Sequence, residues 1–210
     1  MNSAFFFGSR AQVRGQKLIV GLGNPGEPYR RTRHNVGARA VEALARRSGV
    51  ALKNDRFLKS FWACASISGQ KSCLAFPQTF MNLSGEAVVL FLKKKKISVK
   101  DLLVVSDDAS LPLGDLRVRA GGSSGGHNGL QSVIERLGTD EFGRLRLGIG
   151  SPPAGFRGDL ADYVLERFAA AEEMIVKGML ESALEAMETW LTQGTEACMN
   201  IFNRRDKQKD

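Results

Sequence analysis

The sequence predicts a single-domain α/β protein, a three-layer sandwich in which a mixed, mostly parallel sheet is flanked by helices. Two continuous apolar runs, Leu18–Leu22 and Leu102–Val105, are bounded by Gly, Asn and Asp, which is typical of strands buried on both faces. Helical patterns lie between and after these runs, and this alternation favours helices on both sides of a sheet. A chain of 210 residues is long enough to bury one full core.

The first helix and a pair of strands follow the first apolar run. Val36, Ala40 and Leu44 recur every four residues, which predicts an amphipathic helix. The apolar segments 61–67 and 72–76 flank a glycine, and they predict a hairpin or two adjacent strands.

Apolar residues at helical spacing predict three further helices. One contains Val88 and Phe91 and precedes the lysine run 93–96, whose charges suit a helix C-terminus. The second covers residues 130–137, where apolar residues stand at i, i+3, i+4 and i+7, and the third runs from about 170 to 191.

The composition indicates a soluble globular protein with an anionic partner. Lys and Arg outnumber Asp and Glu by 30 to 22, which favours nucleic acid as the partner. No apolar run approaches the roughly 18 residues of a membrane span, so no membrane association is expected.

The three cysteines, Cys64, Cys73 and Cys198, show no CxxC spacing. They predict neither a disulfide framework nor a zinc site, and they favour a reducing, intracellular compartment and a cytoplasmic location.

The chain is expected to have three parts. Residues 1–16 form a flexible N-terminal extension, 17–203 the folded domain and 204–210 a basic tail. The extension contains no acidic residue, and its cluster Phe5–Phe7 is too short for the core of a secretion signal. An organelle transit segment has the same composition, so both readings stay open.

Two glycine motifs match well-known patterns without supporting the usual function. Residues 21–26 satisfy GxGxxG, but Pro25 removes a backbone N–H from the loop that would bind a pyrophosphate. Residues 122–126 satisfy GxSxG, but the only histidine after Ser124 is His127, and no acid lies between them. The second motif is read as a turn, or as a loop whose N–H groups approach phosphates.

The two histidines of the chain are the candidates for chemistry. His34 and His127 each precede an asparagine within a polar run. Asn24 follows the first buried strand, Asp107 ends the second, and the His127 loop follows a strand at 116–120. Ligands bind at the carboxyl edge of open α/β sheets, so these segments are expected to meet in one crevice.

This constellation predicts hydrolysis by an activated water. His34 stands at the start of a helix, where the positive end of the dipole favours a neutral ring that can accept a proton. Asp107 is expected to bond the other ring nitrogen and to orient it. Amides of Asn24, Asn82 and Asn128 are candidates to hold the substrate carbonyl or its oxyanion.

Basic side chains are arranged to suit a polyanion. Arg117 and Arg119 alternate with apolar residues, and so do Arg144 and Arg146. Each pair is therefore predicted to project from one face of its strand.

Several separated motifs occur in the order found in one known family. They are residues 20–26 (VGLGNPG), 29–37 (YRRTRHNVG), 77–85 (PQTFMNLSG), 107–108 with 111–112, 125–130 (GGHNGL) and 144–150 (RLRLGIG). Through them the chain resembles the bacterial-type peptidyl-tRNA hydrolase family, from Lys17 to about Asn203.

The resemblance implies an enzyme that cleaves the ester between a peptide and the 3′ end of tRNA and so recycles prematurely released peptidyl-tRNA. It implies His34 as the catalytic base and Asp107 as its partner. It assigns substrate binding to Asn24, Tyr29, Met81, Asn82, His127 and Asn128, and tRNA contacts to Arg117, Arg119 and Arg146. It further implies a monomer with no metal and no organic cofactor.

Three positions depart from the commonest family pattern: Phe76 and Gln131 replace frequent cations, and Asp108 stands where many relatives carry Glu. Two other functions stay open. Some plant organellar relatives serve as group II intron splicing factors, and the acid-poor N-terminus and Gln131 favour that reading. A general esterase of small substrates is the third reading, but it has no need of 30 basic residues.

Overall fold

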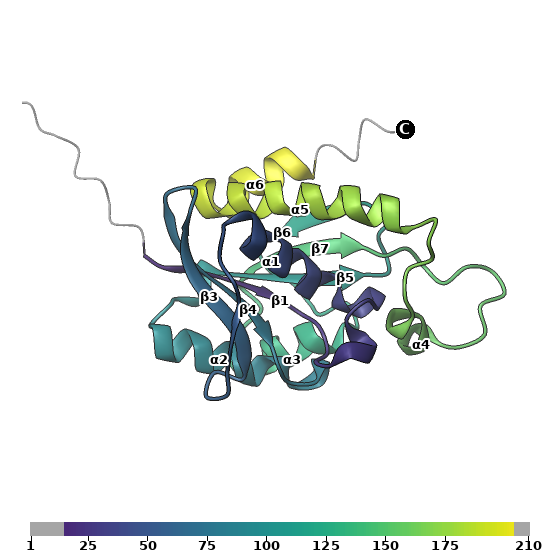
Figure 1. Cartoon of the computed structure of the whole chain (residues 1–210), viewed down its shortest axis with the longest axis horizontal. Coiled ribbons are helices and arrows are strands. Elements are labelled where there is room, and N and C mark those ends of the chain that lie inside the picture. Colours follow the sequence, from purple (N-terminus) through teal and green to yellow (C-terminus); the bar gives the residue numbers. More distant parts are fainter. Residues whose placement is uncertain (1–14, 204–210) are drawn as a thin grey trace, which may run out of the picture.

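The computed structural model describes residues 15–203 (Figure 1). The predicted extension 1–16 lies outside the described residues except for its last two, and the predicted tail 204–210 lies wholly outside them. The strands are β1 (Lys17–Gly21), β2 (Lys53–Asp55), β3 (Ser60–Ile67), β4 (Gln70–Pro77), β5 (Leu102–Asp108), β6 (Leu116–Arg119) and β7 (Gly143–Gly148). The α-helices are α1 (Val36–Arg47), α2 (Ser84–Lys95), α3 (Asn128–Leu137), α4 (Leu160–Leu165), α5 (Glu173–Gln193) and α6 (Thr195–Phe202). Short 3-10 helices are η1 (Glu27–Tyr29), η2 (Arg33–Asn35), η3 (Met81–Leu83) and η4 (Val99–Asp101).

The strands of the described residues form one seven-stranded sheet, in the order β2-β3-β4-β1-β5-β7-β6. In its centre β4, β1, β5 and β7 are parallel to one another. The β2–β3, β3–β4 and β6–β7 pairs are antiparallel. The predicted mixed sheet is confirmed, and so is the hairpin, which consists of β3 and β4.

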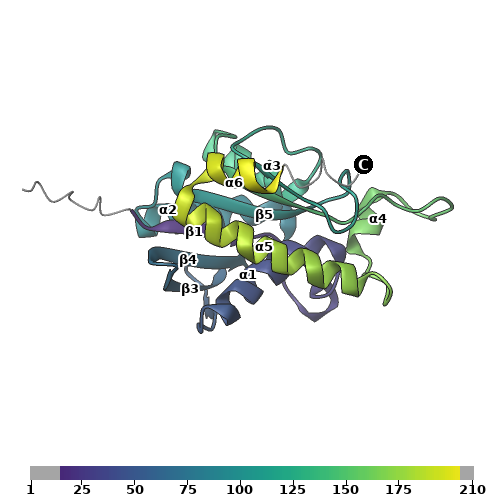
Figure 2. The same cartoon turned by 90° about the horizontal axis from the view of Figure 1, so that it is seen from above.

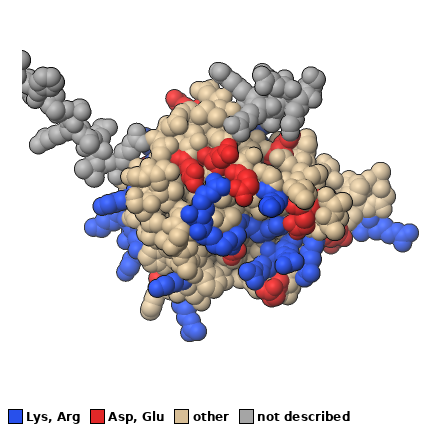
Figure 3. Space-filling model, turned by 45° about the horizontal axis from the view of Figure 1, so that its top comes forward, with Lys and Arg blue, Asp and Glu red and all other residues tan. Residues whose placement is uncertain are grey.

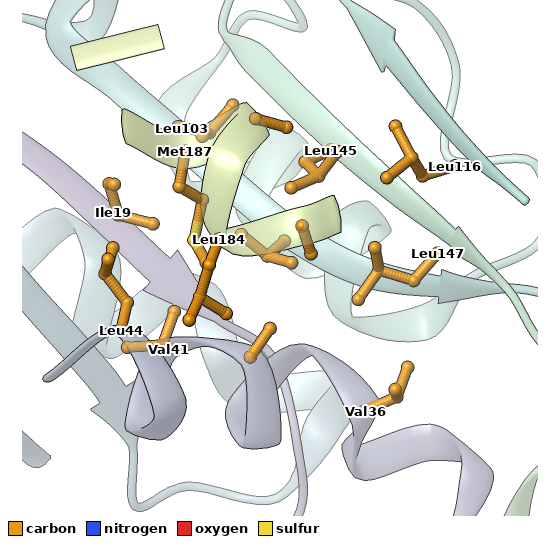
Figure 4. Close-up of a cluster of buried hydrophobic side chains, with 14 of the residues drawn as sticks. Ile19, Val36, Val41, Leu44, Leu103, Leu116, Leu145, Leu147, Leu184 and Met187 are labelled. Carbon is orange, nitrogen blue, oxygen red and sulfur yellow. The ribbon is translucent and has the colours of Figure 1, made fainter. Parts of the chain in front are cut away.

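Helices cover both faces of the sheet. Figures 1 and 2 show α5 running across one side, opposite α2 and α3. Successive residues of β1 point to opposite faces: Ile19 belongs to the core that contains Leu44 of α1 and Leu184 of α5 (Figure 4), whereas Leu18 and Val20 belong to the core beside α2 and α3. The predicted burial of this strand on both faces is therefore confirmed.

Two short elements have no pattern that sequence reasoning can detect. The edge strand β2 has only three residues, all polar, and α4 is shorter than two turns. A capping box starts α4, in which the carboxylates of Asp159 and Asp162 accept each other's backbone N–H. The long predicted helix is α5, and no helix between residues 15 and 203 has both the length and the hydropathy that crossing a bilayer requires.

The hairpin corrects one prediction about the cysteines. Cys64 on β3 lies directly opposite Cys73 on β4, and a disulfide joins them. The expectation that the cysteines form no disulfide is therefore wrong for this pair. The strand register brings the two side chains together, and cysteine spacing alone did not reveal it. Cys198 is a buried free thiol, and burial raises its pKa to about 12.

Candidate active site

A cavity of about 1280 Å³ lies at the carboxyl edge of the parallel strands. Its walls come from the loops after β1, β5 and β7, from η2 and η3, from the glycine-rich loop 121–126, and from α4. The residues expected at the site that line it are Asn24, His34, Met81, Asn82, Asp107, Arg119, His127, Asn128 and Arg146. Tyr29 and Arg117 are not among the lining residues.

Two glycines bring the start of α1 directly against the sheet. A Cβ on Gly21 of β1 would overlap the carbonyl of Gly37, and a Cβ on Gly37 would overlap the carbonyl of Val105 on β5. The helix therefore packs on bare backbone, with no side chain between. This close approach places His34, just before α1, beside Asp107 at the end of β5.

The ring of His34 is oriented by Asp107. Its Nδ1 lies 2.9 Å from Oδ1 and 3.0 Å from Oδ2 of the carboxylate. An ionised carboxylate only accepts hydrogen bonds, so Nδ1 carries the proton and donates it. The neutral ring then has its lone pair on Nε2, and His34 lines the cavity while being only 8 % exposed. This nitrogen can accept a proton from a water in the cavity.

The ring of His127 has the opposite arrangement of its nitrogens. Its Nδ1 accepts the backbone N–H groups of Gly129 at 3.0 Å and Leu130 at 3.2 Å, and so caps the N-terminus of α3. A nitrogen that accepts two N–H groups carries no proton, so the proton lies on Nε2. Nε2 donates to Oδ1 of Asp107 at 3.0 Å. Both nitrogens of His127 are thus occupied, and neither can act as a base.

Asp107 holds a buried negative charge between the two rings. Burial by itself would raise the pKa of its carboxyl, but the nearby rings of His127 and His34 and the hydrogen bonds they donate outweigh this. The pKa of Asp107 therefore lies well below its usual range, and the carboxylate is ionised at neutral pH.

Among the described residues, the same three side chains form a group that could hold a metal ion. One nitrogen of His34, one of His127 and a carboxylate oxygen of Asp107 lie within 4.8 Å of one another. To ligate a metal through Nε2, His127 would have to move its proton to Nδ1, where two backbone N–H groups already donate. The cap on α3 therefore opposes metal binding, and it stabilises the hydrogen-bonded arrangement instead.

Asn24 is held so that only its amide N–H groups remain available. Its Oδ1 accepts the backbone N–H of Met81 at 2.8 Å. Its backbone N–H donates to Oδ1 of Asn35 at 2.9 Å, and its carbonyl accepts from Nδ2 of Asn35 at 2.8 Å. Nδ2 of Asn24 has no acceptor among residues 15–203, and Asn24 is one of the residues that line the cavity. Sequence reasoning missed Asn35, although its place directly after His34 was a possible signal.

The other predicted substrate-binding residues differ in their positions. Asn82 on η3 and Asn128, the first residue of α3, are exposed at the cavity. Met81 is buried beneath it. Tyr29 ends η1, and its carbonyl accepts the N–H of Thr32. The predicted contact of Tyr29 with substrate therefore stays a prediction.

Four arginines share one face of the β6–β7 pair. Arg117 lies opposite Arg146, and Arg119 lies opposite Arg144. Residues directly opposite each other in an antiparallel pair project from the same face. The apolar residues between them belong to the core under α5, so the arginines project from the other face. Arg119 is exposed at the cavity, whereas the charge of Arg146 is paired with Asp108.

Arg144 has a structural contact that sequence reasoning did not assign. It is 2 % exposed and donates to the carbonyls of Ser123 at 2.5 Å and Asp140 at 3.2 Å. The bond to Ser123 fixes the glycine-rich loop that forms one wall of the cavity. The alternation of arginine with leucine on β7 was visible in the sequence, but the partner on a distant loop was not.

The remaining walls of the cavity are largely apolar. Phe80 and Leu83 lie on the η3 side, and Leu160 and Leu165 belong to α4. Each of these residues is at least 40 % exposed, and together they give the cavity an exposed apolar surface. The cavity thus joins an apolar surface, a proton-accepting histidine and a basic rim.

The fold and the site together define an α/β domain whose cavity at the carboxyl edge holds a histidine ring hydrogen-bonded to a buried carboxylate. The family model described as peptidyl-tRNA hydrolase matches residues 18–210. The chain belongs to this family.

Relatives and solved structures agree with this assignment. The peptidyl-tRNA hydrolase of Chloroflexus aggregans is 50 % identical over 187 residues, which cover 89 % of this chain and 98 % of the relative. That of Bacillus anthracis is 45 % identical over 89 % of this chain and 99 % of the relative. A crystal structure of peptidyl-tRNA hydrolase from Acinetobacter baumannii has a TM-score of 0.83 and 38 % identity, covering 89 % of this chain and 94 % of that chain.

Proposed function

We propose that this chain hydrolyses the ester bond between the peptide and the 3′-terminal ribose of tRNA in peptidyl-tRNA, and so recycles tRNA from prematurely terminated translation. The observation that carries the proposal is the fixed proton arrangement at Asp107, which leaves Nε2 of His34 as the one proton-accepting ring nitrogen at the cavity. Family membership supports the choice of substrate.

In the proposed reaction His34 acts as a general base. Nε2 takes a proton from a water whose oxygen attacks the ester carbonyl carbon. Asp107 stabilises the imidazolium that forms. The tetrahedral intermediate then expels the ribose oxygen, which takes the proton back from His34. The free acid of the peptide and the free hydroxyl of tRNA are the products.

Amide donors are positioned for the charge that develops on the carbonyl oxygen. Nδ2 of Asn24 is the best oriented of them, because Met81 and Asn35 hold the rest of the Asn24 amide and backbone. Donors that are fixed before the reaction need no reorganisation when the oxyanion forms. The amides of Asn82 on η3 and Asn128 at the start of α3 are further candidate donors to this oxygen.

The two sides of the cavity suit the two parts of the substrate. The apolar side chains of η3 and α4 suit the peptide. Arg119 and Arg146 at the cavity, with Arg117 opposite Arg146 on β6, suit the phosphates of tRNA. We further propose that the chain works as a monomer, because all of these groups come from one chain. A cytoplasmic location and independence of metal complete the proposal, the latter supported by the bonds at Nδ1 of His127.

The decisive experiment measures release of free tRNA from N-acetyl-aminoacyl-tRNA, with a small acyl ester as the control substrate. We expect rapid cleavage of the tRNA ester and none of the small ester. Equal cleavage of both would favour a general esterase. Binding of tRNA by folded protein without any cleavage would favour an RNA-binding factor on the same scaffold, as in the splicing reading.

A further inference from the structure

Arg33 precedes the proposed base and is buried in a cage of its own. Its guanidinium lies 4.4 Å from the ring centre of Tyr163 and 4.8 Å from that of Phe168. NH2 donates to Oε2 of Glu172 at 2.8 Å, and NH1 lies 3.5 Å from the carbonyl oxygen of Ile149. Only 7 % of the side chain is exposed, although arginine is seldom buried to this degree.

The partners of Arg33 belong mainly to the segment that carries the far wall of the cavity. Tyr163 lies on α4, and Phe168 and Glu172 lie between α4 and α5. Two backbone contacts join the same two segments. The N–H of Arg33 donates to the carbonyl of Glu166 at 2.9 Å, and Thr32 forms an isolated antiparallel β-bridge with Arg167. Figure 1 shows α4 beside the purple segment that contains η2.

The cage therefore links the base to the surface that faces the substrate. His34 is the next residue after Arg33 on η2, whereas Leu160 and Leu165 on α4 line the cavity. Besides the Arg33 contacts, the two backbone contacts and the burial of Tyr163 and Phe168 in the core that contains Val36 hold this segment against the start of α1. A shift of α4 relative to η2 would change the distance between the peptide and Nε2 of His34.

The contacts of the buried Arg33 guanidinium contribute more to the position of α4 than to the free energy of unfolding. Burying an ion pair costs desolvation that its attraction only partly offsets, and apolar replacements of similar volume are often equally stable. The Nε of Arg33 has no hydrogen-bond partner among residues 15–203, so the cage is not even fully satisfied. What the planar guanidinium supplies is one defined geometry, fixed by two rings and a carboxylate at once.

We propose that Arg33 is a positioning residue that sets the distance between the His34 base and the α4 wall of the cavity. This inference rests on the proposed hydrolase function. Arg33 touches neither substrate nor reacting atoms; it acts through η2 and α4.

The test compares Arg33→Met and Arg33→Lys with Arg47→Met as a matched control. Arg47 on α1 also pairs with α5, through Glu181 at 2.5 Å and Glu188 at 3.9 Å. These three side chains are partly exposed, and none of them lines the cavity. Figure 3 shows basic and acidic side chains interspersed on the side of the molecule where α5 lies.

For Arg33→Met we expect kcat on N-acetyl-aminoacyl-tRNA to fall about tenfold, with KM within about twofold of wild type, because misplacement acts on the chemical step. Arg33→Lys keeps the charge without the planar fork and is expected to recover part of kcat. Arg47→Met is expected to leave both constants unchanged. A folded Arg33→Met protein with wild-type kcat would overturn the proposal, and so would an equal loss in Arg47→Met.

Two further measurements keep the test decisive. If Arg33→Met does not fold, Glu172→Ala replaces it, because this change removes the carboxylate that accepts from the Arg33 guanidinium and leaves Arg33 in place. An unchanged kcat in folded Glu172→Ala also overturns the proposal. Hydrogen exchange of residues 160–172 in Arg33→Met reports the link without any substrate. Unchanged exchange in Arg33→Met would refute the role of Arg33. If exchange is faster in Arg33→Met but the wild-type protein does not cleave the tRNA ester, only the hydrolase function is refuted.

Discussion

The loops that contain His34 and His127 look alike in sequence but differ in what their backbones do. Each histidine precedes an asparagine, and each donates one ring N–H to Asp107. The rings lie 4.8 Å apart between centroids. The second nitrogen of His127 caps α3, whereas the second nitrogen of His34 has no protein partner among the described residues and belongs to a side chain that lines the cavity.

The role of each histidine follows from the ring nitrogen that does not bond Asp107. Two similar rings share one carboxylate, yet only the ring without a backbone donor keeps a lone pair for chemistry. The capped ring instead fixes the carboxylate from the other side. Substitutions that replace one ring nitrogen at a time test whether His34 accepts the proton and His127 fixes the carboxylate.

The largest effect is expected for His34→Asn. The Asn amide can still donate to Asp107 from the place of Nδ1, but nothing replaces the accepting Nε2. We expect kcat to fall about 10²- to 10⁴-fold, the usual contribution of a general base. Release of tRNA in single-turnover assays measures the loss, and gel-shift binding of tRNA is the control, expected to be unchanged. Turnover within tenfold of wild type would assign the base elsewhere.

Asp107→Asn is expected to have the next largest effect. The amide removes the charge that stabilises the imidazolium and meets two N–H donors with its own NH₂, so kcat should fall about 10²-fold or more.

The same variant makes a prediction about pH. Because the pKa of Asp107 is lowered, the carboxylate stays ionised throughout the neutral range and does not itself titrate there. The charge that stabilises the imidazolium is therefore constant across the neutral range, so Asp107→Asn should lower kcat at every pH in that range. Rates of both proteins measured from pH 6 to pH 8 check this, and a variant that matches wild type at any of these pH values would contradict the pairing with His34.

Two substitutions of His127 separate its two contacts. His127→Asn keeps an acceptor for the cap of α3 and loses the donor to Asp107, so kcat should fall about tenfold although the N-cap of α3 is preserved. His127→Gln keeps a donor near Asp107 and loses the cap, so the free energy of unfolding should fall by about 1 kcal/mol while kcat changes little. Urea unfolding and tRNA release measure the two effects. The reverse pattern would show that the cap serves catalysis.

The smallest effect on the chemical step is expected away from both histidines. Changing Arg117 and Arg119 together to Glu should raise KM for the tRNA substrate and leave kcat within about twofold. The slope of log Kd against log salt should also become shallower, by about 0.9 for each phosphate that the variant no longer neutralises. Binding at several salt concentrations checks this, and an unchanged slope would place the RNA on another surface.

Much of the fold could be predicted from local pattern. The stripes of α1, α3 and α5 repeat with the helical period because one face of each helix packs against a core. The runs of β1 and β5 are continuously apolar because both faces of these strands are buried. The strand β2 and the helix α4 could not be found in this way. They are too short to complete a pattern, and contacts with the rest of the chain hold them.

The site, like the fold, could be predicted from the sequence only in part. The chain order of polar residues after apolar runs correctly indicated that Asn24, His34 and Asp107 would meet, because the carboxyl ends of parallel strands share one edge. The roles of Asn35 and Arg144 were missed, because their partners lie on other elements.

Fold class, family and the residues that build the site follow from the order of residues along the chain, because periodicity and motif order are properties of that order. The pairing of Cys64 with Cys73, the link from Arg33 to the segment after α4, and the difference between the two histidines became visible in the folded molecule. A hydrogen bond, a disulfide or an ion pair requires atoms at a definite distance and direction. Spacing along the chain does not fix either until the register of strands and the packing of helices are set.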